Sequence, residues 1–252
     1  MIRTHDACVL VDCGFSYKKL CERMPALELE PCDIDAILVT HEHADHIRGV
    51  GPTARKLNIP VYLTDGTAQT RALGRLPRLE ILQAGDAVQF GELLARAHGV
   101  PHDAREPVQF TFHYRGLSLG LLTDVGSIPD DLLDAFRRLH GLILEANHDV
   151  QMLAYGPYPP GLKQRVGGHF GHLSNEQCRY VLDHIDWSLL QHLVIAHVSQ
   201  KNNSAERVTA MLDGLPLAEV GFEIACQERG FTWRTLTSST IASLAEPAAA
   251  CI

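Results

Sequence analysis

The 252-residue sequence lacks the long apolar run of a membrane helix, because charged or polar residues interrupt each hydrophobic stretch before about 18 residues. Its N-terminal residues also lack the apolar stretch of a secretory signal peptide. The seven cysteines are scattered along the chain and include no CxxC pair. We therefore expect a cytoplasmic protein in which the thiols are reduced and mostly buried.

Basic residues are scarce as well: 22 Lys and Arg stand against 30 Asp and Glu, for a formal net charge of −8. This balance argues against a broad basic surface for nucleic acid. It does not exclude a nuclease, because bound divalent cations can supply positive charge locally. Aromatic residues make up only 6% of the chain, so few stacking platforms for bases are expected.

Short apolar runs alternate with helix-forming segments along most of the chain, which favours an α/β fold. We expect a single domain over residues 1–234 and a mobile tail over 235–252. Pro and Gly dominate residues 155–161, which predicts a stiff loop there. Helices are predicted over 17–23, 130–139, 149–155, 175–184 and 204–212, and strands over 8–12, 35–40, 61–63, 142–145, 192–196 and 219–224.

Histidine is unusually frequent, with 14 residues in the chain, and it is the commonest metal ligand in proteins. Four side chains that can bind a metal stand within six residues: His41, His43, Asp45 and His46. They follow a predicted buried strand, so a turn there can direct them toward two neighbouring centres. Imidazoles with a carboxylate suit Zn²⁺ or a similar ion, so this motif predicts a metal site rather than a polar surface loop.

Three more candidate ligands lie far along the chain, each at or near the end of a predicted strand: His102, Asp124 and His197. Strand ends that converge on one edge of a sheet commonly build a site. Such convergence would bring these three side chains to the first cluster.

The HxHxDH motif, followed by a distant histidine, a strand-terminal aspartate and a strand-terminal histidine, resembles the metallo-β-lactamase superfamily over residues 9–221. The resemblance implies an αββα four-layer sandwich of two mixed β-sheets flanked by helices. It also implies two divalent metal ions, Zn²⁺ or alternatively Mn²⁺, with Asp124 bridging them. One ion would be held by His41, His43 and His102, and the other by Asp45, His46 and His197.

The early part of the chain both matches and departs from this superfamily. Asp12 matches the acidic residue that orients a ligand histidine, the alternative being a solvated carboxylate in a turn. Relatives begin with a strand and a Ser-Gly-Ser-x-Gly-Asn turn that this sequence does not contain. Either translation was assigned from an internal methionine, or the sandwich lacks its first N-terminal strand.

Four segments, which begin at His102, Glu145, Gly171 and Ala196, look like the YycJ/WalJ group of the superfamily. That group is similar to 5′-to-3′ DNA exonucleases. The Gly-His-Leu-Ser stretch around His172 also looks like the Gly-His-Ser-Thr stretch of ribonuclease Z, whose histidine acts beside the metals. By this resemblance His172 binds phosphate or transfers a proton; the alternative is a residue merely adjacent to a helix N-terminus.

Other polar residues leave two readings open. His148 and Asp149 follow a buried strand, where they either act on substrate or metal or cap the next helix. Lys163 and Arg165 either meet a backbone phosphate or remain solvated. Structural or surface roles are expected for the remaining histidines, which are His5, His98, His113, His140, His169, His184 and His192.

The sequence thus predicts a dinuclear metal-dependent hydrolase, a phosphodiesterase or nuclease of the 5′-to-3′ DNA exonuclease kind. A hydroxide bridging the metals would attack phosphorus, with His172, Asp45 and His148 as the catalytic side chains. The alternative is a thioester or lactam hydrolase of the glyoxalase II or β-lactamase type, since the same ligands serve both chemistries. DNA is the expected partner, with no membrane and no obligate protein partner.

Overall fold

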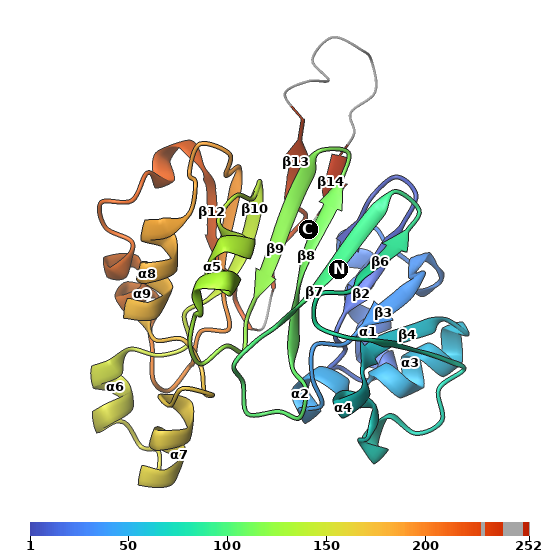
Figure 1. Cartoon of the computed structure of the whole chain (residues 1–252), viewed down its shortest axis with the longest axis horizontal. Coiled ribbons are helices and arrows are strands. Elements are labelled where there is room, and N and C mark those ends of the chain that lie inside the picture. Colours follow the sequence, from blue (N-terminus) through green and yellow to red (C-terminus); the bar gives the residue numbers. More distant parts are fainter. Residues whose placement is uncertain (228–229, 239–248, 252) are drawn as a thin grey trace. The chain divides into compact units, whose positions relative to one another are not determined.

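The computed structural model describes residues 1–227, 230–238 and 249–251, and these form two compact units. Unit 1 comprises Met1–Gly99, Ala104–Leu117 and Thr232–Ile252, whereas unit 2 comprises Val100–Asp103 and Ser118–Phe231. Each unit has its own hydrophobic core, so each is described by itself (Figure 1). The domain boundary expected at residue 234 stays a prediction.

The main sheet of unit 1 changes from antiparallel to parallel pairing at β2, in the order β13-β14-β1-β2-β3-β4-β5. Val11 of β2 lies opposite Leu38 of β3, so both parallel strands deliver the residues after them to one edge. The strands are β1 (Ile2–Arg3), β2 (Cys8–Val11), β3 (Ala36–Leu38), β4 (Pro60–Thr64), β5 (Arg78–Leu82), β13 (Thr235–Thr237) and β14 (Ala249–Cys251).

Unit 1 also contains an antiparallel arrangement of β6, β7 and β8, and short helices that connect its parallel strands. Ser16 caps the first helix by accepting a hydrogen bond from the N–H of Lys19. The strands are β6 (Ala87–Phe90), β7 (Leu93–Gly99) and β8 (Val108–Tyr114). The helices are α1 (Tyr17–Arg23), α2 (Ala44–Ile47), α3 (Val50–Leu57) and α4 (Asp65–Ala68), with 3₁₀ turns at Met24–Leu27, Pro31–Asp33 and Arg71–Leu73.

Four strands of unit 2 pair in parallel in the order β12-β11-β10-β9. Leu144 of β10 lies opposite Leu122 of β9 and Ile195 of β11, and all three side chains are buried. Buried central strands are expected where helices cover a parallel sheet. The carboxyl ends of these strands therefore meet at one edge. The strands are β9 (Leu117–Leu122), β10 (Gly141–Glu145), β11 (His192–Ala196) and β12 (Gly221–Ile224).

The helices of unit 2 include two pairs that are visible in Figure 1, α8 with α9 and α6 with α7. A capping box between Ser174 and Gln177 begins α8, which covers the ten residues predicted. Lys163 on α7 donates a hydrogen bond to the carbonyl of Ala154 on α6 at 2.7 Å. The helices are α5 (Asp130–Phe136), α6 (Val150–Tyr155), α7 (Pro160–Val166), α8 (Asn175–His184) and α9 (Ala205–Met211), with a 3₁₀ turn at Leu217–Glu219.

Residues 155–161 differ from the predicted stiff loop, because α7 begins inside them at Pro160. Proline is favoured at the first helical position, since the N–H that it lacks would have no partner there. A residue that breaks helices elsewhere therefore starts one here.

Strands form at two places in the segment for which a mobile tail was predicted. Residues Thr235–Thr237 form β13, whose Leu236 is buried, and Ala249–Cys251 form β14. β14 pairs antiparallel with both β13 and β1. The mobility of the tail stays a prediction. Residues 239–248 and 252 lie outside the described part of the chain.

The described residues were compared with two expectations, on membrane-spanning helices and on the cysteines. No helix within 1–227, 230–238 and 249–251 is both long and apolar enough to cross a membrane. The cysteines whose side chains are described are free thiols, and Cys8, Cys13 and Cys178 among them are buried.

Candidate active-site residues

The HxHxDH motif of unit 1 lies where the chain leaves β3 and turns into α2. His41 is buried, and its Nε2 lies 3.0 Å from Nδ1 of His43. The ring of His46 packs against that of His41, with centroids 4.1 Å apart. The exposed Asp45 carboxylate lies 3.7 Å from Nε2 of His46. The structure thus gathers the four predicted ligands of this motif on one turn.

Asp12 and Thr40 orient two of these imidazoles. The Asp12 carboxylate accepts hydrogen bonds from Nδ1 of His46 and from the N–H and hydroxyl of Thr40, each at 2.8 Å. Because the Thr40 hydroxyl donates its hydrogen to Asp12, it accepts from Nδ1 of His41 at 2.9 Å. Metal-binding histidines usually give their second nitrogen to such an acceptor. The orienting role predicted for Asp12 requires this contact.

Gly14 allows the turn to approach the end of β2 closely. A Cβ atom on Gly14 would lie 1.7 Å from the carbonyl oxygen of Asp45, far inside any possible contact. The N–H of Cys13 donates to the carbonyl of His46, and the N–H of Gly49 donates to that of Cys13, both at 2.7 Å. Backbone contacts therefore hold the motif in addition to Asp12, and a side chain at position 14 would prevent them.

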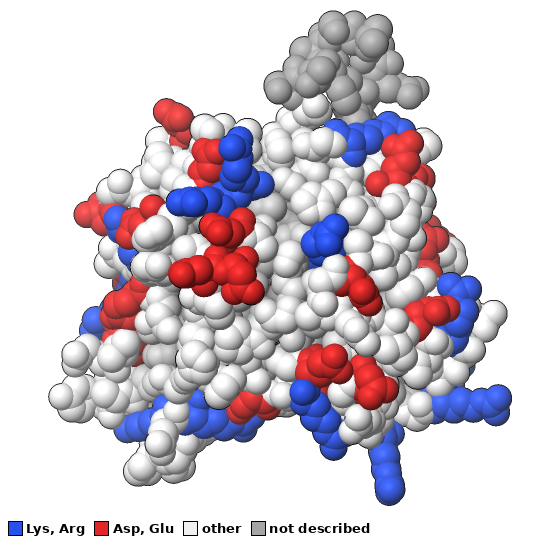
Figure 2. Space-filling view, in the orientation of Figure 1, with Lys and Arg blue, Asp and Glu red and all other residues white. Residues whose placement is uncertain are grey.

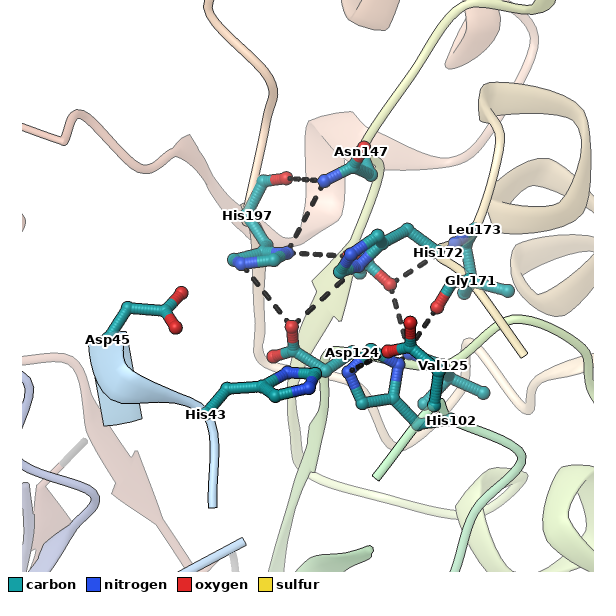
Figure 3. A network of polar contacts seen from close by, with 12 residues as sticks. His43, Asp45, His102, Asp124, Val125, Asn147, Gly171, His172, Leu173 and His197 are labelled. Carbon is teal, nitrogen blue, oxygen red and sulfur yellow. Dashed lines mark hydrogen bonds and ion pairs between the residues drawn. The ribbon is translucent and has the colours of Figure 1, made fainter. Parts of the chain in front are cut away.

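In unit 2, candidate residues come from the ends of three neighbouring parallel strands. Asp124 follows β9, Glu145 ends β10 and His197 follows β11. Figure 3 shows Asp124, His172 and His197 pointing toward one another. The possible ligand atoms of four residues lie within 4.8 Å of one another: Asp124, Glu145, His172 and His197. The matched register of the strands explains why residues so distant in sequence meet.

Glu145 is the site residue to which the sequence analysis assigned no role. Its fully buried carboxylate accepts hydrogen bonds from Nδ1 of His197 at 2.6 Å and Nδ1 of His172 at 2.9 Å. The N–H groups of Val125 and Leu173 also donate to it, both at 3.2 Å. Burial alone would raise its pKa, but the hydrogen bonds from the two histidines lower the pKa, so Glu145 is ionised.

A sequence signal for Glu145 does exist. The run Leu-Ile-Leu-Glu places a carboxylate at the end of a buried strand, as at the two predicted aspartates, Asp12 and Asp124. A single carboxylate of this kind does not by itself indicate a functional role, although His148 follows three residues later. Only its position beside two histidines identifies it.

His172 lies between two carboxylates. Its Nδ1 is 2.9 Å from Glu145 and 3.7 Å from Asp124. Burial disfavours the imidazolium form, but the hydrogen bond and negative charge of Glu145, helped by Asp124, outweigh burial and raise the pKa of His172. The arrangement therefore favours a protonated imidazole, which can donate a proton.

His102 and His197 each have Nδ1 held by an oxygen acceptor. His102 is buried and donates from Nδ1 to the carbonyl of Gly171 at 3.0 Å, while burial lowers its pKa and favours the neutral, metal-binding form. His197 donates to Glu145, and its Nε2 lies 3.4 Å from Asp124. The amide of Asn147 further holds His197 by donating to its carbonyl at 3.1 Å.

Three candidate residues have left-handed backbone conformations: Asp12 (φ 54°), Asp124 (φ 54°) and His197 (φ 55°). Few residues other than glycine adopt this region, and such conformations persist where surrounding structure enforces them, often at functional sites. Each of the three residues follows the end of a parallel strand. In each of these residues the left-handed conformation bends the chain where it leaves the strand, at the edge of the sheet.

For His148 and Asp149 the alternatives were a role toward substrate or metal and capping of the next helix. Asp149 caps α6 by accepting from the N–H of Met152 at 2.8 Å and forms an ion pair with Arg207 at 3.2 Å. His148 is buried, its backbone pairs with Ser174, and burial lowers its pKa. The capping role is therefore observed for Asp149, whereas a catalytic role for His148 stays a prediction.

Two histidines outside the site have ordinary structural partners. His98 bonds to the Thr111 hydroxyl at 2.9 Å, and His184 donates to the carbonyl of Tyr180 at 2.7 Å. These contacts agree with the structural roles expected for both residues.

The donor set suits divalent metal ions. Four imidazoles have Nδ1 occupied by an oxygen partner, which leaves Nε2 as the ligating nitrogen: His41, His46, His102 and His197. The carboxylates of Asp45 and Asp124 add oxygen ligands. Imidazole nitrogen and carboxylate oxygen are ligands that Zn²⁺ accepts readily and that Mn²⁺ also takes.

Comparisons with known proteins give consistent matches. Residues 8–197 match the family model described as Beta-lactamase superfamily domain. The chain is 34% identical over 234 residues to the exodeoxyribonuclease YycJ of Bacillus anthracis, covering 91% of this chain and 85% of that protein. It is 36% identical over 220 residues to the exodeoxyribonuclease WalJ of Streptococcus pneumoniae serotype 2, covering 84% and 82%.

A solved structure supports the same fold. The chain superposes on the metallo-β-lactamase fold protein YhfI from Bacillus subtilis with a TM-score of 0.66 and 18% identity. The match covers 91% of this chain and 88% of that one.

Proposed function

Because the chain belongs to the β-lactamase superfamily, we propose that it is a dinuclear metal-dependent phosphodiesterase that releases nucleotides from DNA ends. The superfamily, the YycJ/WalJ resemblance and the sandwich fold class predicted from the sequence are confirmed by the matches. The number of ions, their identity and the DNA substrate belong to the proposal.

The residues that would hold the ions are those of the predicted set. His41, His43 and His102 would bind one ion, Asp45, His46 and His197 the other, and Asp124 would be shared. When bound, the cations would supply an acidified water for attack on phosphorus and would neutralise the phosphate oxygens. The oriented Nε2 atoms and the buried Asp124 support this assignment.

The hydrogen bond between Glu145 and His172 is the observation that carries the phosphodiesterase proposal. A sugar oxygen is a poor leaving group on phosphorus, and a proton donated by His172 would help it to leave. The buried Glu145 carboxylate raises the pKa of the imidazole and fixes its orientation through Nδ1. A positioned acid of this kind typically contributes about 10²–10⁴-fold to the rate.

The decisive experiment measures the metal content of the purified protein by mass spectrometry and digestion of a 5′-labelled duplex DNA by the same sample. We expect about two ions per chain, as in two-metal hydrolases, and stepwise nucleotide release. A protein that binds no divalent ion would overturn the proposal. Two bound ions without digestion of DNA would reject DNA as the substrate.

A thioester or lactam hydrolase is the competing function, since the same ligands serve both reactions. A thiolate leaves without receiving a proton, so the acid built from Glu145 and His172 favours the phosphodiester over the thioester. The leaving nitrogen of a lactam also needs a proton, so the lactam is distinguished by measured rates. Rates on bis(p-nitrophenyl) phosphate, nitrocefin and a glutathione thioester discriminate between them. Faster turnover of either of the last two would reject the phosphodiesterase.

A further inference from the structure

The α6–α7 segment, defined as residues 150–171, leaves the site of unit 2 and returns to it. Beside its start, the N–H of Asn147 donates to the carbonyl of Leu173 at 2.9 Å. Beyond its end, the N–H of Asn175 donates to the carbonyl of His148, also at 2.9 Å. The segment is therefore anchored at both ends next to His172, the proposed proton donor.

This segment exposes large apolar side chains. Of the eight large hydrophobic residues that are exposed among the described residues, four lie in it. They include Tyr155, which is 86% exposed, and Phe170, which is 57% exposed. None of the α7 side chains is buried, so the helix does not serve the core. Half of the exposed large hydrophobic side chains among the described residues therefore fall in this one segment, as expected for a binding surface.

The same segment differs from the rest of the chain in charge. No Asp or Glu occurs between Asp149 and Glu176, in a protein that has 30 acidic residues. Lys163 lies within it, as does Arg165, which forms an ion pair with Asp103. Lys201 places its ammonium 5.7 Å from the ring centre of Tyr158. In Figure 2 the surface over α6 and α7 is mainly white and blue, whereas red side chains gather over α5. Positive charge here complements a phosphate backbone.

We propose that the α6–α7 segment binds a single DNA strand that leads to the site, an inference that rests on the proposed function and specifies its substrate. Exposed rings beside basic side chains form the usual platform for single strands, because unpaired bases stack on aromatics while phosphates meet cations. In a duplex the base faces are covered, so Tyr155 and Phe170 select unpaired nucleotides. Lys163 and Lys201 supply positive charge for the phosphate backbone of the DNA.

The test compares the double variant Tyr155→Ala/Phe170→Ala with Tyr180→Ala, which removes a tyrosine that is 46% exposed on α8, outside the segment. Binding of a fluorescent phosphorothioate oligothymidine by the metal-loaded protein is measured by anisotropy. Hydrolysis of bis(p-nitrophenyl) phosphate is measured on the same samples.

Loss of stacking is expected to weaken oligothymidine binding about 10-fold or more in the double variant. The Tyr180 variant and the conservative Tyr155→Phe/Phe170→Tyr variant should bind like the wild type. Hydrolysis of the small ester should be unchanged in all of them, because none of these side chains belongs to the site.

Equal binding by the double variant and the wild type would overturn the inference while leaving the proposed function intact. Equal loss of binding to a blunt duplex would overturn the selection of unpaired strands. If the wild type does not bind oligothymidine and the double variant differs from it in oligomeric state, the surface would be assigned to protein association instead. Absence of ester hydrolysis in the wild type would reject the proposed function and not the surface.

Discussion

The two units assemble their candidate residues in different ways. Unit 1 places four possible ligands on one turn, from His41 to His46, and fixes that turn through Asp12 and Gly14. Unit 2 collects residues that are spread from His102 to His197, because parallel strands in register end at the same edge. A local motif needs one correctly formed turn, whereas a dispersed cluster needs a whole sheet.

The supporting carboxylates differ in the same way. Asp12 is partly exposed and contacts His46 and the neighbouring Thr40. Glu145 is fully buried and holds two histidines together with two backbone N–H groups. Damage to the first should remain local, whereas damage to the second should affect metal binding and proton donation together.

Replacing Asp124 by alanine should produce the largest effect. The residue would be shared by both ions, so Asp124→Ala should reduce phosphodiesterase activity to background, a larger loss than the about 10²–10⁴-fold effect of removing an acid. Metal content measured by mass spectrometry should fall as well. Full activity in this variant would contradict the shared ligand.

His172→Ala should separate chemistry from metal binding. Turnover should fall by about 10²–10⁴-fold, because the leaving oxygen loses its proton donor. Metal content should stay at the level of the wild type. Unchanged turnover of duplex DNA would remove His172 from the mechanism.

The pair Asp12→Asn and Glu145→Gln tests the contrast between the two units directly. Loss of a carboxylate that orients a ligand usually lowers metal affinity or activity by about 10–100-fold. Saturating metal should restore turnover in Asp12→Asn but not in Glu145→Gln, since His172 also depends on Glu145. Titration of activity with Zn²⁺ and Mn²⁺ measures this difference, and full rescue of both variants would refute it.

Gly14→Ala should act through the turn and through stability, not by removing a ligand or a proton donor. The added Cβ would meet the Asp45 carbonyl, so the free energy of unfolding should fall by about 1–3 kcal/mol, as for other overpacked sites. Gly161→Ala is the matched control, because a Cβ there meets nothing within 4 Å. Thermal melts of both variants, followed by circular dichroism, should show a lower midpoint for Gly14→Ala alone.

Elements with strong local signals were predictable. The ends of α8 and β11 match the prediction, since a capping box starts the helix and an apolar run forms the strand. The HxHxDH motif was equally clear, because its residues are close together in the sequence. The helix α7 was missed because Pro160 and its neighbours indicate a loop, although proline is favourable where a helix starts.

By itself the sequence determined which candidate ligands are present, which strands end in them and to which superfamily the chain belongs. These properties depend on residue type and short-range spacing. Only the tertiary structure decided that Glu145 joins His172 to His197, and that exposed aromatic and basic side chains gather on the α6–α7 segment. Both results depend on burial and strand register, which arise only when distant segments pack.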